Sequence, residues 1–180
     1  MRLFIGIKLD DKAKKKIDNY FKLFYENKVR GNYTRISNLH MTLIFLGEIN
    51  SDKVDKLKDI VGKIKVSNGV LKINKIKMLK EIMIGEIEKT KELNEIYLSL
   101  KNELKKESFS FDEHNFYPHI TLVRRAENHQ KYIGVDMNIT SCFDKITLFE
   151  SKRIGSELVY MDLGEWYERN ARIRKNRNNS

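Results

Sequence analysis

Apolar residues recur along the chain with two periods, and these periods predict the order of strands and helices. Short β-rich runs bounded by Asp, Gly or Asn predict the strands. They lie at residues 2–9, 39–46, 70–87 (a pair), 119–124, 143–150 and 157–163.

Helical spacing of apolar residues predicts three helices between these strands. Asp10 or Asp11 can cap the first, Ser51 and Asp52 are N-cap candidates for the second, and Thr90 caps the third. Their apolar faces are Ile17, Tyr20, Phe21 and Phe24; then Val54, Leu57, Val61 and Ile64; then Leu93, Ile96, Tyr97, Leu100 and Leu104.

The mixed order of β-β-α and β-α-β units predicts an α+β fold with largely antiparallel sheet. No Pro-rich or Ser/Gly-rich linker interrupts the pattern, so residues 1–168 are expected to form one domain. The periodicity stops at Arg169, and residues 169–180 are predicted to be a disordered basic tail.

Composition limits the class of protein. Of the 180 residues 41% are hydrophobic and 33% charged, which is typical of a soluble globular protein. The only cysteine, Cys142, excludes a disulfide framework, and we expect it to be a buried thiol in a reducing compartment. Apolar stretches such as 43–46 are far shorter than the roughly 18–20 residues of a membrane span, and the first residues do not form a signal peptide, so a cytoplasmic protein is expected.

The charge is strongly positive. Lys and Arg total 35 against 25 Asp and Glu, so the net charge is +10. Five of these charges lie in residues 169–180, which contain no acid. A basic protein favours polyanionic partners, but a Lys-rich solvated surface has the same composition, so charge alone does not decide between them.

One short pattern occurs twice. The sequence HMTL at 40–43 and the sequence HITL at 119–122 share their first, third and fourth residues, and each lies on a predicted strand. Since side chains alternate across a strand, each His and the Thr two residues later share one face, while the intervening residue points to the core. A single His-x-Thr is usually a satisfied histidine, but its repetition favours a functional pair.

The pair suits acid–base chemistry on a phosphate. An imidazole has a pKa of about 6.5, so His40 and His119 can supply a base and an acid at neutral pH. Hydroxyls of Thr42 and Thr121 can donate to phosphate oxygens. A metal site on the two histidines would need a carboxylate ligand that these strands do not offer, so no metal is expected. His114 and His129 lie in polar segments and are expected to be solvated.

These residues resemble the 2H phosphoesterase superfamily, whose signature is two His-x-Thr/Ser-x motifs. The chain looks most like its RNA 2′,3′-cyclic phosphodiesterase branch, also known as 2′-5′ RNA ligase. The likeness extends from Met1 to Trp166 through MRLFIGIKLDD, NLHMTLIFLGEI, FYPHITLVR and FDKITLFESKRIGSELVY, in the family's order.

The resemblance implies two pseudo-symmetric lobes of mainly antiparallel sheet with outer helices, and a central cleft with one His-x-Thr strand from each lobe. It implies hydrolysis of an RNA 2′,3′-cyclic phosphate to a 2′-phosphate without a cofactor, and 2′-5′ ligation as the reverse reaction. By resemblance His40 is the acid that protonates O3′, and His119 is the base that activates water. Thr42 and Thr121 hold phosphate oxygens.

Three further positions bear on the substrate. Arg124 corresponds to a family arginine, but strict alternation puts it opposite His119, so it reaches the phosphate only if the strand ends or bulges. Tyr33 stands where many members have tryptophan, and Lys77 and Lys80 lie in a middle region that departs from the family pattern.

Two other functions remain open. One is cleavage of 2′,5′-linked oligonucleotides, or of a small cyclic nucleotide, by the same chemistry. The other is a non-catalytic RNA-binding module, which would have no use for both histidines. In each case the partner is RNA or a nucleotide, and a monomer is expected.

Overall fold

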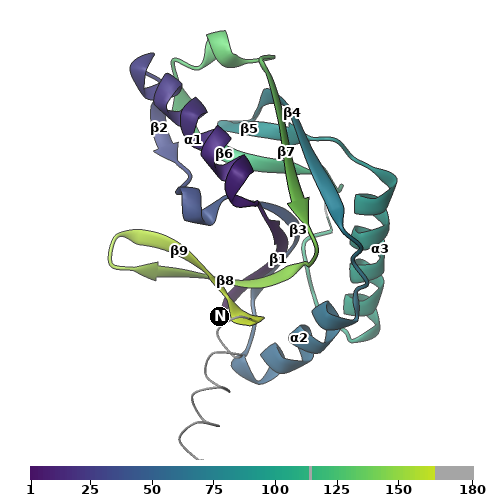
Figure 1. Ribbon diagram of the computed structural model, residues 1–180. Helices are drawn as coiled ribbons and strands as arrows, with labels where there is room; N and C mark the ends of the chain where they lie inside the picture. Colours follow the sequence, from purple (N-terminus) through teal and green to yellow (C-terminus); the bar gives the residue numbers. More distant parts are fainter. Residues whose placement is uncertain (114, 165–180) are drawn as a thin grey trace, which may run out of the picture.

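The computed structural model describes residues 1–113 and 115–164. It shows a curled antiparallel sheet with helices on its outside (Figure 1). The strands are β1 (Arg2–Lys8), β2 (Arg30–Tyr33), β3 (His40–Glu48), β4 (Gly69–Leu79), β5 (Ile82–Ile87), β6 (His119–Glu127), β7 (Asp136–Phe143), β8 (Thr147–Ile154) and β9 (Glu157–Asp162). The helices are α1 (Asp11–Glu26), α2 (Val54–Lys63) and α3 (Lys91–Lys106).

The two halves of the sheet join at one short contact. Strand order is β7-β4-β5-β6-β3-β1-β8-β9, with β2 paired to β6. At the centre β3 and β6 pair only through Met41 and Ile120, and both side chains are fully buried. The α+β fold with antiparallel sheet is therefore confirmed, and its two lobes are halves of one continuous sheet.

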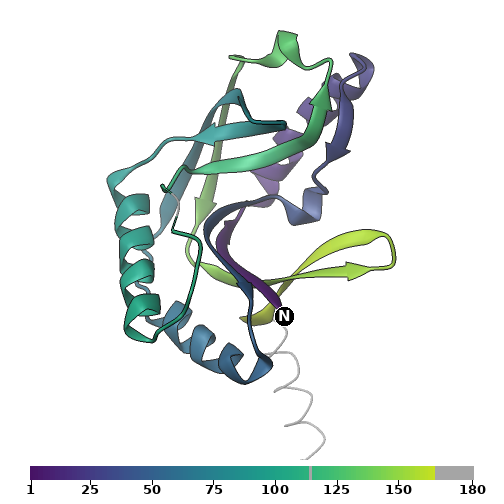
Figure 2. The same ribbon diagram turned by 180° about the vertical axis from the view of Figure 1, so that it is seen from behind.

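The helices cover the sheet from two sides. Helix α1 packs against β7, whereas α2 and α3 contact each other and lie against β8 and β3 respectively (Figures 1 and 2). The side chain of Asp10 caps α1 by accepting a hydrogen bond from the backbone of Ala13 at 2.8 Å. Its other carboxylate oxygen accepts from the backbone of Cys142 at 2.7 Å, so one residue ties α1 to β7.

Most predicted elements are present. Thr90 caps α3 as predicted, and all five predicted apolar residues of that helix are buried. The second helix differs, because neither Ser51 nor Asp52 caps it. Both lie within a 3₁₀ turn, Ser51–Lys53, that leads into α2 without any side-chain cap.

Two strand predictions were wrong. Strand β7 was missed: the predicted strand 143–150 overlaps it only at Phe143 and begins four residues before β8, because the apolar residues on both sides of the turn read as one run. The short strand β2 was missed, since it carries Gly31 and Asn32, which are typical of a break. The bounds of β1, β3, β4 and β5 match the predicted strands within a few residues.

Cys142 is exposed, so the prediction of a buried thiol was wrong. Strand β7 alternates, with Ser141 and Phe143 inward and Cys142 outward. His129 is partly buried rather than solvated, because the turn Gln130–Tyr132 carries the Tyr132 ring into the core beside Phe24. His114 and the tail 169–180 lie outside the described residues.

Candidate active site

The two His-x-Thr segments meet at the centre of the sheet. Their register pairs Met41 with Ile120, so one step to either side sets His40 opposite Thr121 and His119 opposite Thr42. All four polar side chains are half-buried on one face, while the middle residues fill the core behind them. The predicted residues are thus brought together by a single antiparallel contact.

Each motif strand bulges at its fourth residue. Along β1 and β3 the pairs Ile5–Ile44 and Gly6–Thr42 skip one residue, and along β5 and β6 the pairs Met83–Val123 and Ile84–Thr121 do the same. The skipped residues are Leu43 and Leu122, each of which is buried together with the residue that follows it.

The bulge decides where Arg124 points. Because Leu122 and Val123 are both buried, the next side chain returns to the face that carries His119. Arg124 is exposed and lines the same cavity as His40 and Thr121. The condition set by the sequence for Arg124 to reach a phosphate is therefore met.

Both histidines are oriented by a carbonyl two residues earlier. Nδ1 of His40 lies 2.6 Å from the oxygen of Asn38, and Nδ1 of His119 lies 2.7 Å from the oxygen of Tyr117. A carbonyl only accepts, so Nδ1 carries the proton and the lone pair of a neutral ring is at Nε2. The hydroxyl of Thr42 lies 3.0 Å from Nε2 of His40 and donates to it. Nε2 is therefore the nitrogen that each neutral ring has available for proton transfer.

His40 has an aromatic environment. Its ring centroid lies 4.8 Å from Phe4, 5.8 Å from Phe149 and 5.0 Å from Tyr160, the last meeting it edge-on. Burial lowers the pKa of His40 to about 4, and the electrostatic effects of nearby Arg124 and His119 act in the same direction. The hydrogen bond to Asn38 opposes this only in part. In the unliganded protein His40 is therefore neutral at pH 7.

The neighbours of the two histidines differ in charge. Lys8 is the cross-strand partner of His40 and forms an ion pair with Asp162 at 2.8 Å. Glu86 is the cross-strand partner of His119. The two motifs therefore differ in the residue directly opposite the histidine, a lysine in one and a glutamate in the other, and each of these residues is held in an ion pair.

A polar cluster holds Glu86 in place. Its Oε1 accepts from Lys77 and from the hydroxyl of Tyr117, each at 2.7 Å. The Lys77 bond is the main reason that the pKa of Glu86 lies below its usual value. The sequence singled out Lys77 but not Glu86, to which Lys77 and Tyr117 both donate. Lys80 lies elsewhere, at a hollow shared with Arg125 and His129.

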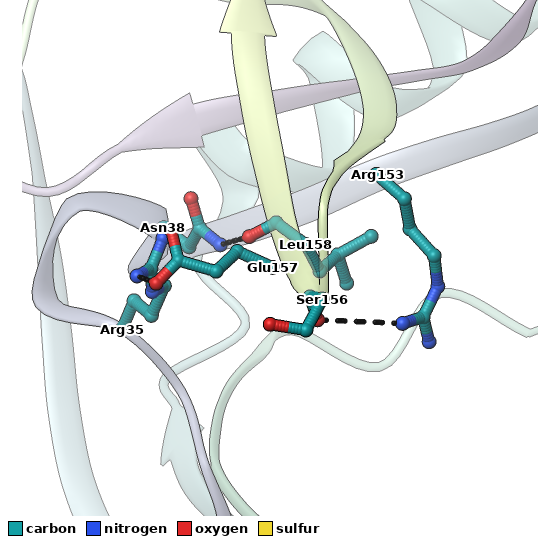
Figure 3. Close-up of polar contacts among 6 residues, drawn as sticks. All are labelled: Arg35, Asn38, Arg153, Ser156, Glu157 and Leu158. Carbon is teal, nitrogen blue, oxygen red and sulfur yellow. Dashed lines mark hydrogen bonds and ion pairs between the residues drawn. The ribbon is translucent and has the colours of Figure 1, made fainter.

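A cavity of about 470 Å³ opens beside His40, which is within the range of nucleotide-sized sites. One wall is the segment from Asn32 to Asn38, and the opposite wall is the hairpin of β8 and β9. Figure 3 shows the two walls in contact. Arg35 pairs with Glu157, and Asn38 donates from Nδ2 to the carbonyl of Leu158 at 2.8 Å.

Asn38 is a site residue that sequence reasoning missed. It is only 7% exposed, and its Oδ1 also accepts from the backbone of Tyr160 at 3.3 Å. Its side chain thus binds β9 as a neighbouring strand would, while its carbonyl orients His40. Its position two residues before the motif was the available signal, because Tyr117 has the same offset from His119.

Tyr33 also lines the cavity, at the position where the family often has tryptophan. Its ring stacks on Tyr25 with centroids 4.1 Å apart, and its hydroxyl donates to the carbonyl of Val29 at 2.9 Å. Burial raises the pKa of Tyr33 to about 12, so the phenol stays protonated. Tyr33 therefore serves the cavity as a fixed, neutral aromatic surface.

The described residues offer neither a cluster of metal-ligating side chains nor a helix suited to a membrane. Across residues 1–113 and 115–164, no three His, Cys, Asp or Glu side chains are grouped so that they could hold a metal ion. In the same part of the chain no helix has the length and apolarity needed to span a membrane.

The fold and the paired histidine strands define a phosphoesterase of the 2H class, and comparison with known proteins agrees. Residues 7–81 match the model of the LigT-like phosphoesterase family. The RNA 2′,3′-cyclic phosphodiesterase of Thermotoga maritima is 30% identical over 131 residues, covering 69% of this chain and 70% of that protein. The Escherichia coli enzyme of the same name is 23% identical over 168 residues, covering 92% and 95%. The chain belongs to this RNA 2′,3′-cyclic phosphodiesterase family.

Solved structures share the fold. E. coli LigT in complex with 3′-AMP superposes with a TM-score of 0.76 at 23% identity, over 90% of this chain and 94% of that one. A Thermus thermophilus protein gives 0.76 at 17% identity, over 91% and 95%. The curled sheet is therefore retained where few residues are identical.

Proposed function

We propose that the protein hydrolyses the 2′,3′-cyclic phosphate of an RNA end or a nucleotide to a 2′-phosphate. One observation carries the proposal: two histidines whose Nδ1 atoms are held by carbonyls lie on one face, each opposite a threonine of the other motif. Membership of the family supports the same substrate class.

In the proposed reaction, Nε2 of His119 takes a proton from water as the water oxygen bonds to phosphorus. The bond from phosphorus to O3′ breaks, and Nε2 of His40 gives its proton to the departing oxygen. Thr42 and Thr121 donate to the non-bridging oxygens, and Arg124 balances their charge. Protons alone stabilise the attacking and leaving groups, so no metal or cofactor is required.

Substrate binding favours the uptake of a proton from solvent by His40. Its ring is neutral in the unliganded protein because burial lowers its pKa. A bound phosphate anion beside Nε2 favours the imidazolium and raises that pKa. His40 thus becomes an acid once an anionic substrate is in place.

The same geometry serves 2′-5′ ligation, in which the 5′ hydroxyl of a second RNA end takes the place of water. O5′ bonds to phosphorus as His119 takes its proton, the bond from phosphorus to O3′ breaks, and His40 protonates O3′, which leaves a 2′-5′ linkage. We propose a cytoplasmic monomer for either direction, since the histidines, threonines and Arg124 all come from one chain. Gel filtration with light scattering checks the oligomeric state.

A ³¹P NMR time course tests the function. The purified protein is mixed with cytidine 2′,3′-cyclic phosphate, or a short RNA with a cyclic end, in excess EDTA. We expect a 2′-phosphate resonance to appear. A 3′-phosphate would reverse the leaving group assigned to His40, and loss of activity in EDTA that a divalent ion restores would revive a metal mechanism. No turnover would direct attention to 2′,5′-linked substrates, and then to a binding module.

A further inference from the structure

The hairpin of β8 and β9 turns one face toward His40. Cross-strand partners share a face, and the pairs on that face are Phe149–Asp162, Ser151–Tyr160 and Arg153–Leu158. Phe149 and Tyr160 contact the His40 ring. Alternation therefore sets Arg153 and Leu158 on the cavity face, about 7 Å farther out than the Ser151–Tyr160 pair.

Arg153 has no acidic partner among the residues that the structure describes. Within that part of the chain, its one hydrogen bond, from Nη1 to the carbonyl of Ser156, is long at 3.5 Å (Figure 3). Arg35, on the other side of the tip, is paired with Glu157. Considering residues 1–113 and 115–164, the cavity therefore presents two guanidiniums without a carboxylate partner, Arg124 near the histidines and Arg153 on the hairpin.

The hairpin tip is fixed at this position. The Arg35–Glu157 ion pair and both hydrogen bonds of Asn38 hold β9 against the opposite wall. A site with a fixed wall loses less conformational entropy on binding than a loose loop does. Leu158, next to Arg153, offers apolar surface to a sugar or base.

We propose that Arg153 forms a second phosphate subsite, which binds the phosphate on O5′ of the nucleoside that carries the cyclic phosphate. In a polynucleotide this group is the internucleotide phosphodiester, one sugar away from the reacting phosphorus. The subsite makes RNA ends better substrates than nucleosides with a free 5′ hydroxyl. This inference rests on the proposed function and specifies its substrate.

Three substrates test it: cytidine 2′,3′-cyclic phosphate with a 5′ hydroxyl, the same nucleotide with a 5′ phosphate, and the dinucleotide CpC with a 2′,3′-cyclic phosphate. Arg153→Ala should lower kcat/KM for the dinucleotide by about tenfold, the effect of one charge-assisted hydrogen bond. It should change kcat/KM for the 5′-hydroxyl nucleotide less than twofold. An equal loss with the 5′-phosphate nucleotide extends the subsite to monoesters, and no loss there restricts it to the phosphodiester.

Lys152→Ala is the matched control. It removes the same charge one residue away, on the opposite hairpin face, and should leave kcat/KM unchanged for all three substrates. The inference is wrong if Arg153→Ala lowers kcat/KM equally for all three substrates, changes none of them, or is reproduced by Lys152→Ala.

Binding separates this inference from the proposed function. The dinucleotide CpCp with a 3′-phosphate and 3′-CMP are titrated calorimetrically at several salt concentrations. Arg153→Ala should weaken only CpCp binding, and should reduce the slope of log K against log salt by about 0.7. If no cyclic phosphate turns over, the proposed function fails, and this selective loss still decides whether the subsite exists.

Discussion

The carbonyl oxygen of Asn38 lies 2.6 Å from Nδ1 of His40, while the side chain of Asn38 binds the backbone of β9. One residue thereby connects the orientation of the first histidine to the hairpin that walls the cavity. Tyr117 has the same relation to His119 through its carbonyl, and its hydroxyl binds Glu86 instead. Each motif thus extends two residues before its histidine.

Replacing the Asn38 side chain should weaken both the fold and the reaction. Asn38→Ala leaves the Leu158 carbonyl and the Tyr160 N–H without their partner, so the free energy of unfolding should fall by about 1–3 kcal/mol. Urea denaturation measures the free energy of unfolding. Turnover of the variant and of wild type is compared under conditions in which both are folded. Asn50→Ala, at an exposed residue without a side-chain cap bond, should stay within about 0.5 kcal/mol of wild type. An Asn38 variant as stable and as active as that control would refute the role of Asn38.

Removing either histidine should abolish most turnover. His40→Ala and His119→Ala should each lower kcat by at least about 10²-fold, because each removes one proton transfer. Binding of a nucleotide 3′-phosphate should change only a few-fold. His129→Ala is the control, since His129 lies at the separate hollow with Lys80 and Arg125. Full turnover in both variants would exclude the two-histidine mechanism, and lost binding by a protein that never turns over would support the binding module.

The stability of the protein should depend on His40 in mildly acidic solution. The folded pKa is about 4, below the roughly 6.5 of the unfolded chain, so the unfolded state binds the proton first as pH falls. The contribution of neutral His40 to the free energy of unfolding is fully present above about pH 6.5. It is lost as the pH falls from about 6.5 to about 4. Wild type should lose on the order of 2 kcal/mol more than His40→Gln between pH 7 and pH 4. Identical losses in denaturant titrations would show that His40 is not desolvated.

A phosphate in the cavity should raise the pKa of His40. The ring is neutral in the free protein because of burial, and an anion near Nε2 stabilises its charged form. NMR titration of the imidazole with and without inorganic phosphate measures the change, and His129 supplies an internal control. An unchanged His40 titration at saturating phosphate would mean that the anion binds elsewhere.

Packing behind the first motif should be intolerant of a single methyl group. A Cβ on Gly6 would lie 2.6 Å from the carbonyl oxygen of Met41 and 3.5 Å from Cδ2 of His40. Gly6→Ala must therefore displace β3 and should cost about 1–3 kcal/mol and lower kcat. Gly62→Ala in α2 meets no atom within 4 Å and should be neutral or stabilise by up to about 1 kcal/mol. Comparable thermal stability and turnover in both variants would contradict the packing at Gly6.

Local sequence patterns were sufficient to predict many of the strands and helices of this protein. The apolar run of β1, the His-x-Thr alternation at the start of β3, the helical spacing of α3 and the Thr90 cap depend on residues near one another in sequence, so they could be predicted. The errors at β7 and β2 have the same origin. Two adjacent apolar runs do not reveal the turn between them, and the Gly31–Asn32 pair does not reveal the partner strand β6.

The repeated His-x-Thr pattern by itself determined which side chains share a face, because alternation along a strand is a local property. Only the tertiary structure decided what those faces meet. The pairing of Met41 with Ile120 sets each histidine opposite the other strand's threonine, and the bulge at Leu122 returns Arg124 to their side. Of the rings that bury His40, Phe149 and Tyr160 come from the hairpin more than a hundred residues away in the chain, as does Arg153, and Phe4 comes from β1. Register, bulges and desolvation depend on which strands become neighbours, and a sequence pattern does not contain that information.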